Sequence, residues 1–138
     1  MPYVNLTRYL GVWYEQASIP AYFEINCEQT YANYSFNDDG TIRVDNACIR
    51  SGRKTESIGV AYPDPQDTAK TNAKLKVKFP AAPVAGDYWI VRLDDSYSRV
   101  VISSPTYRYL WILYRSPIMS EQEYQATIDD LKQDGFPV

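Results

Sequence analysis

Few side chains in this sequence are suited to chemistry, and the types that are missing restrict its function first. The 138 residues contain no histidine, which removes Ser-His-Asp and Cys-His catalysis as well as histidine-ligated zinc or copper. Two cysteines, Cys27 and Cys48, are too few for a four-thiolate metal site. The sequence therefore predicts no metal and no cofactor. The side chains left to consider are carboxylates and tyrosines, together with Arg115.

Trp13 and Arg115 form the most informative pair. Trp13 stands in Gly11-Val12-Trp13-Tyr14-Glu15 at the start of the first strand-like run, and Arg115 ends the last one. If the first and last strands are neighbours, the sheet is closed and the guanidinium can stack on the indole, a contact worth ~0.5 to 2 kcal/mol. The alternative is a core tryptophan and an arginine at a solvated strand end.

Cys27 and Cys48 flank a hairpin signal, the turn residues 37–40 between two strand-like runs. Folding of this hairpin would bring the two cysteines within one or two rungs of each other. A disulfide is favoured over two unrelated buried thiols. It implies an oxidising compartment, so we expect the protein to be secreted, periplasmic or at the cell surface.

Short alternating segments separated by turns make up most of the chain. Eight strand-like runs are expected: Gly11 to Ile19, Thr30 to Phe36, Thr41 to Ile49, Thr55 to Tyr62, Ala73 to Phe79, Asp87 to Leu93, Arg99 to Ser104 and Tyr107 to Arg115. Most connections are too short for a parallel crossover, which favours antiparallel neighbours.

Two helical segments accompany the strands. Ser120 and Glu123 form a capping box, and Gly135 with Pro137 ends the helix that follows. Its narrow apolar stripe predicts packing against the outside of the sheet. A helical turn is expected over Leu6 to Leu10.

The length predicts one domain over 1–138. The net charge of -3 argues against nucleic acid as a partner. No apolar stretch is long enough for a membrane-spanning helix.

The order of these elements resembles the lipocalin family. The segments that carry the resemblance are 6–15, 32–36, 93–97 and 109–117, and they are most similar to the branch of apolipoprotein D, plant temperature-induced lipocalins and bacterial outer-membrane lipocalins. The resemblance implies an all-β fold: an eight-stranded antiparallel up-and-down β-barrel with a short N-terminal helical turn and one C-terminal α-helix packed outside. Gly11, Trp13 and Arg115 would be its structural residues.

Alternate residues of such strands face the barrel interior. The alternation of apolar and polar residues assigns the inward side chains of the first five strands, because the opposite assignment would bury Arg43, Lys74, Lys76 and Lys78. The resemblance assigns the inward side chains of the last three strands, with Trp89 and Val91 as an alternative inward pair on the sixth strand. The expected ligand-binding residues are Glu15, Ala17, Ala32, Tyr34, Phe36, Val44, Asn46, Gly59, Ala61, Leu75, Val77, Phe79, Tyr88, Ile90, Ile102, Tyr109 and Trp111.

Small and flat side chains in this set favour a hollow calyx over a barrel packed to native density, which is the alternative. Glu15 is the one ionisable side chain expected inside. It would accept hydrogen bonds from tyrosine hydroxyls such as those of Tyr34 or Tyr109, or orient the polar head of a ligand together with Asn46.

The leading hypothesis is a non-enzymatic carrier or scavenger of a small hydrophobic ligand: a fatty acid or lysophospholipid, a retinoid or carotenoid, a sterol, or a tetrapyrrole. The ligand would enter between the loops Pro20 to Asn26, Ser51 to Lys54 and Pro80 to Gly86. The last loop is uncharged; it would touch a membrane or close as a lid, or be an ordinary connection. The rivals are a lipocalin-fold enzyme of the isomerase or de-epoxidase type and an interaction module using outer tyrosines. A monomer or homodimer is expected.

Overall fold

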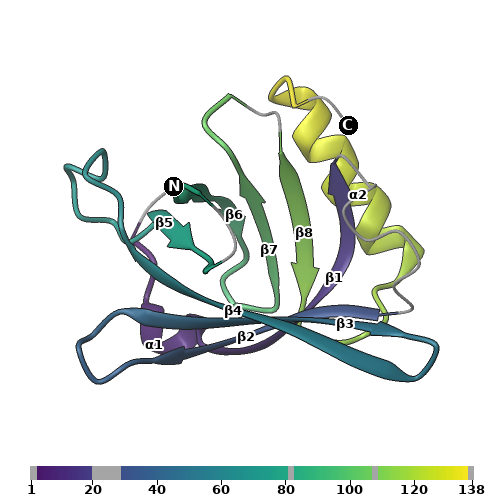
Figure 1. Cartoon of the computed structure of the whole chain (residues 1–138). Helices are drawn as coiled ribbons and strands as arrows, with labels where there is room; N and C mark the ends of the chain where they lie inside the picture. Colours follow the sequence, from purple (N-terminus) through teal and green to yellow (C-terminus); the bar gives the residue numbers. More distant parts are fainter. Residues whose placement is uncertain (1–2, 20–28, 81–82, 107–108, 137–138) are drawn as a thin grey trace.

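The computed structural model of the chain describes residues 3–19, 29–80, 83–106 and 109–136. They form a short helix, eight strands and a longer helix (Figure 1). The bounds are α1 Leu6–Tyr9, β1 Gly11–Ile19, β2 Gln29–Phe36, β3 Ile42–Arg50, β4 Arg53–Pro63, β5 Lys74–Lys78, β6 Gly86–Leu93, β7 Arg99–Ser103, β8 Leu110–Tyr114 and α2 Glu121–Gln133.

The strands form one closed barrel in sequence order. Every strand pairs antiparallel with its neighbours, and β1 closes the sheet by pairing with both β2 and β8. In Figure 1, β2, β3 and β4 make a long twisted ribbon that crosses β1, β7 and β8. This architecture confirms the expected up-and-down barrel.

An up-and-down barrel gathers alternate connections at the same end. The connections β2–β3, β4–β5 and β6–β7 lie at the end that α1 covers, which we call the α1 end. The connections β3–β4, β5–β6 and β7–β8 lie at the other end, which we call the far end. The expected entry loop Pro20 to Asn26 lies outside the described residues.

The observed strand boundaries differ most from the predicted ones at β8 and β4. β8 begins at Leu110, so Tyr109 precedes the strand instead of lying within it. β4 is longer than expected, because its pairing with β3 continues to Arg50 opposite Arg53, across a tight turn. Ser51 and Gly52 occupy that turn with positive φ, a conformation that favours glycine at the second position.

Two apolar clusters separate the inside of the barrel from its outside. The inner cluster contains buried side chains of α1 and the strands, among them Trp13, Val44 and Ile102. The outer cluster joins α2 to the outer faces of β7 and β8, with Leu131 of the helix fully buried against Val101 and Ile112. The helix thus packs outside the sheet, as its narrow apolar stripe predicted. Its capping box is formed: the Ser120 hydroxyl accepts from the Glu123 backbone N–H at 3.1 Å.

Two register shifts set the phase of the strands. One lies between Glu15 and Ala17 of β1, and the other between Ile90 and Arg92 of β6. A bulge of this kind inserts one extra residue and reverses which side chains face inward. Ile90, before the β6 shift, belongs to the inner cluster and Leu93, after it, packs against that cluster, whereas Val91 packs with the outer one. The alternative inward pair Trp89 and Val91 is wrong.

Cys48 lies on β3 opposite Thr30 of β2, and Cys27 lies outside the described residues. Within the described part of the chain, neither helix has the length and apolar content needed to cross a bilayer.

Candidate functional site

Arg115 closes the α1 end of the barrel. Its guanidinium lies 3.8 Å from the centroid of the Trp13 ring, within the range of a cation–π contact. The same group donates to four backbone carbonyls, those of Arg8, Tyr9, Val12 and Tyr97, at 2.9 to 3.1 Å. It thereby ties α1, β1 and the β6–β7 connection together.

Gly11 allows this approach. Its φ is +104°, and a Cβ atom added there would lie 3.2 Å from the Arg115 Nη1. A side chain at this position would be strained by the backbone conformation and would crowd the guanidinium. The tight spacing of Gly11 and Trp13 is thus explained by the arginine that packs over them.

Three tyrosines form the floor above this contact. The hydroxyl of Tyr88 lies 2.6 Å from that of Tyr9 and donates to that of Tyr34 at 2.7 Å. The Tyr9 ring stacks on Tyr34 with centroids 5.6 Å apart and packs against Trp13 at 5.2 Å. Burial raises the pKa of all three phenols above the usual value, so each stays neutral.

This hydroxyl chain was not found from the sequence. Tyr9 was expected only as part of the helical turn over Leu6 to Leu10, and its partner Tyr88 is 79 residues away. Tyr97 was also missed: its hydroxyl accepts from the Asn5 backbone N–H, and its ring lies 4.0 Å from the Arg8 guanidinium. The segment 93–97 carried the family resemblance, but its residues gave no indication of this long-range contact.

Inward side chains become more exposed from the α1 end to the far end. Along β3, Ile42 and Val44 are buried and Asn46 is exposed. Along β4 in the reverse direction, Ala61 and Gly59 are buried and Ser57 is exposed.

The opposite wall shows the same gradient. On β5, Leu75 is buried and Val77 is half-buried; on β8, Leu113 is buried and Trp111 is half-buried. Tyr109, one step further, is 37% exposed and stacks on Trp111 at 6.2 Å. The described interior is thus closed at the floor and accessible at the far end.

Most of the expected ligand-binding residues lie on this inner face. Eleven of them belong to the inner cluster or pack against it: Ala32, Tyr34, Val44, Ala61, Leu75, Val77, Phe79, Tyr88, Ile90, Ile102 and Trp111.

Glu15 and Gly59 complete the described wall. Glu15 is half-buried opposite Leu113 of β8, and its charge contributes to the raised pKa of Tyr34. Gly59 lies under the Phe79 ring, because a Cβ atom there would come within 2.8 Å of the ring and of the Lys78 carbonyl oxygen. The glycine therefore makes room for Phe79.

Two expected ligand-binding residues do not line the calyx. Ala17 packs with the outer cluster beside α2, because the bulge at Gln16 reverses the alternation of β1. Phe36 is 48% exposed and pairs with Ile42 beyond the start of β1, which begins opposite Tyr34. It therefore lies past the floor and outside the calyx.

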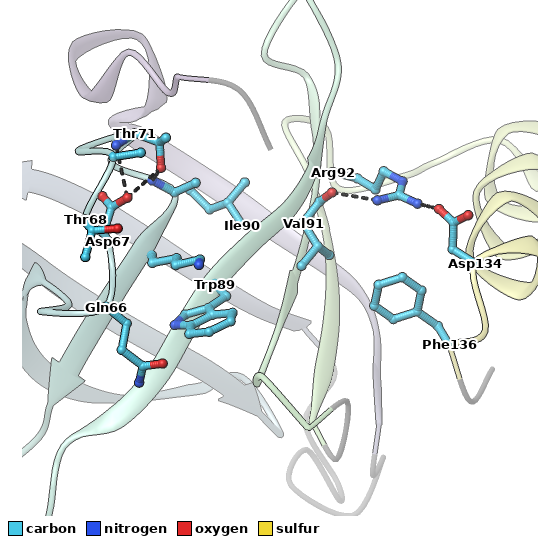
Figure 2. Close-up of a pocket in the computed structure, with 13 residues that line it drawn as sticks. Gln66, Asp67, Thr68, Thr71, Trp89, Ile90, Val91, Arg92, Asp134 and Phe136 are labelled. Carbon is cyan, nitrogen blue, oxygen red and sulfur yellow. Dashed lines mark hydrogen bonds and ion pairs between the residues drawn. The ribbon is translucent and has the colours of Figure 1, made fainter.

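A pocket of about 520 Å³ lies outside the barrel, between the 64–73 segment, β6 and the end of α2 (Figure 2). Figure 2 shows Trp89 beside Gln66 on one side and Arg92 facing Asp134 on the other. Ile90 is the one expected ligand-binding residue that lines it. This pocket is distinct from the site that the sequence predicts.

The charged groups of the outer pocket hold its walls together. Arg92 forms ion pairs with Asp130 and Asp134 of α2. The Trp89 indole N–H donates to the buried carboxylate of Asp64 at 3.1 Å, and the Lys74 ammonium lies 4.6 Å over its ring. The pocket therefore lies where the barrel contacts the end of α2.

Comparison with known proteins agrees with this geometry. The family model of the lipocalin-like domain matches residues 4–138. The chain is 39% identical to temperature-induced lipocalin-1 of Arabidopsis thaliana, over 98% of this chain and 75% of that protein. It is 38% identical to the outer membrane lipoprotein Blc of Escherichia coli, over 95% of this chain and 73% of that protein.

A solved structure shows the same fold. Insecticyanin from the tobacco hornworm Manduca sexta superposes with a TM-score of 0.76 at 20% identity, over all of this chain and 77% of the other. The two curated relatives are a plant temperature-induced lipocalin and a bacterial outer-membrane lipoprotein, both of the branch that the sequence motifs indicated. The chain belongs to the lipocalin family.

Proposed function

We propose that the protein is a non-enzymatic carrier or scavenger that holds a small hydrophobic ligand inside the barrel. The observation that carries the proposal is the graded exposure of the inner wall, from buried Leu113 to half-buried Trp111 and exposed Tyr109. The lipocalin family is known for binding small hydrophobic ligands, which supports it. Apolar burial would drive binding at about 25 cal/mol per Å².

The ligand would lie with its apolar part toward the floor. The floor hydroxyls already bond to one another, and the middle of the wall carries apolar groups such as Val44, Ala61 and Ile102. The exposed polar side chains Asn46 and Ser57 lie toward the far end. A fatty acid or lysophospholipid with its polar group at that end fits this order, and the other candidates are a retinoid or carotenoid, a sterol and a tetrapyrrole.

An enzyme on this barrel is the less favoured alternative. Of the carboxylates in the described strands, Glu15 is the one that the register places on the inner face. General acid–base catalysis usually needs a second positioned group near the reacting atoms. The proposed role of Glu15 is to support the hydroxyl of Tyr34 or the head of a ligand.

The compartment follows from the cysteines. A bond between Cys27 and Cys48 would join the start of β2 to β3, and such bonds persist outside the reducing cytosol. We propose a secreted, periplasmic or cell-surface location, for which the name of the outer membrane relative is support. Contact with a bilayer, where such a ligand would be taken up or released, follows from the carrier proposal.

Native mass spectrometry of protein purified from its own source tests the carrier function. The expected result is one reproducible adduct that solvent extraction releases as a lipid or pigment. Protein that is ligand-free from its source and binds no member of a lipid series in titration would refute the proposal.

A further inference from the structure

The far end of the barrel carries an exposed apolar loop. Val84 is 72% exposed in the β5–β6 connection, with Pro80 and Pro83 exposed beside it. The segment 79–86 contains no charged residue. Tyr109, 37% exposed in the β7–β8 connection, lies at the same end. Apolar side chains gathered around an opening mark a contact surface more often than single exposed residues do.

Basic side chains lie at the same end. At the β3–β4 turn, Arg50 stands directly opposite Arg53, and Lys54 follows. All three are exposed, and Glu56 offsets part of the charge through its ion pair with Lys54 at 3.2 Å.

The α1 end has the opposite charge. Its described turns carry Asp38 and Asp39 between β2 and β3, and Asp94 and Asp95 between β6 and β7. Among the described residues, the β3–β4 turn at the far end is thus basic, whereas the turns of the α1 end carry more carboxylates, Asp64 and Asp67 included, than the bases Lys70, Arg8 and Arg115 that lie near them.

We propose that the far end docks on an anionic phospholipid bilayer, with Val84 entering the interface and the β3–β4 turn binding lipid phosphates. This inference rests on the proposed function, since docking places the accessible end of the calyx against the source of its ligand. Anionic lipids attract basic residues near the surface over about a Debye length. The same field repels the acidic α1 end, so it selects one orientation.

Vesicle co-flotation of the full chain tests the proposal, with phosphatidylcholine vesicles that contain or lack phosphatidylglycerol. We expect binding to the anionic vesicles that weakens as salt is raised. Arg53→Gln should lower that affinity about five-fold, the expected effect of one basic residue near an anionic surface. Lys70→Gln, which removes an exposed lysine from the β4–β5 segment at the α1 end, should leave it unchanged.

Val84→Asp and Ile118→Asp form the matched apolar pair. Ile118 is 82% exposed, more than Val84, but it follows the α1 end of β8. Val84→Asp should reduce vesicle binding by at least the same factor, and Ile118→Asp should not. Equal effects of the two variants, or no preference of the unmodified protein for anionic vesicles, would overturn the docking proposal.

Oleate binding in vesicle-free solution separates this proposal from the carrier function. Oleate affinity retained in Val84→Asp alongside lost vesicle binding supports docking. Oleate binding without vesicle selectivity overturns docking and leaves the carrier function standing. Vesicle binding without oleate or other lipid binding overturns the carrier function on which the inference rests.

Discussion

Arg115 makes contacts at the α1 end that no other type of side chain could reproduce. Its planar guanidinium stacks on Trp13 and donates to four carbonyls that point at it from three segments. A lysine could keep the charge but could not present donors in this fork, so several carbonyls would lose their partner. At this position Arg and Lys are not equivalent.

Arg115→Lys should therefore lower the free energy of unfolding by about 1 to 3 kcal/mol. Urea denaturation followed by circular dichroism measures this change. Arg53→Lys, at the exposed β3–β4 turn, is the control and should change stability by less than about 0.5 kcal/mol. Similar losses in both variants would show that the carbonyl contacts contribute nothing specific.

At the scale of elements, the bulges decide which face each strand presents. The shift at Gln16 sends Ala17 to the α2 side, whereas β5 pairs with β6 without a shift and keeps Val77 inside. Both side chains are half-buried, so the same substitution at the two sites separates the inner face from the outer one.

Val77→Glu should weaken fatty-acid binding at least ten-fold, because entry of the ligand would desolvate the new carboxylate beside its own. Stability should change little, since water can reach this part of the wall. Ala17→Glu should instead cost about 1 to 3 kcal/mol of stability by placing a charge against the outer cluster. It should leave ligand affinity unchanged. Titration calorimetry and urea denaturation provide the two readouts, and exchanged effects would contradict the assigned faces.

The strands could be predicted because local patterns define them. Lysines alternate with apolar residues along β5, so only one phase of that strand avoids burying charge, and Ser120 with Glu123 specifies where α2 begins. The two bulges could not be predicted, since barrel closure sets them and no residue type near Gln16 or Val91 requires them. The hydroxyl contact of Tyr9 with Tyr88 could not be predicted for a similar reason, because it depends on how distant segments come together at the floor.

At the scale of the whole molecule, the two ends of the barrel differ in how completely their inward side chains are buried. Aromatic rings, an arginine and α1 seal the α1 end, and the inner wall becomes accessible toward the far end. The helix α2 braces the outside without entering the interior. This arrangement lets a ligand exchange at one end while the fold is held at the other.

The sealed base predicts alkaline instability. The pKa of Tyr9, Tyr34 and Tyr88 is raised by burial in the folded protein and close to 10 in the unfolded chain. Neutral phenols thus stabilise the fold fully below pH 10, and this contribution is lost as the pH rises from there toward the folded-state values.

Tyrosinate absorbance during an alkaline titration checks this expectation. The three buried phenols should ionise only together with loss of circular dichroism. A single reversible step for all tyrosines, with the fold intact, would contradict a sealed floor.

The most direct test of a ligand site inside the barrel uses the three tryptophans as position markers. Trp13 lies in the floor, Trp111 on the inner wall and Trp89 in the outer pocket. Their indole N–H signals in a ¹⁵N-correlated NMR spectrum, assigned with Trp89→Phe and Trp111→Phe, are followed during titration with oleate or lysophosphatidylcholine. We expect a saturable shift of the Trp111 signal at equimolar ligand, with Trp89 unchanged. A shift of Trp89 alone, or no shift of Trp111 with any lipid of the series, would contradict it.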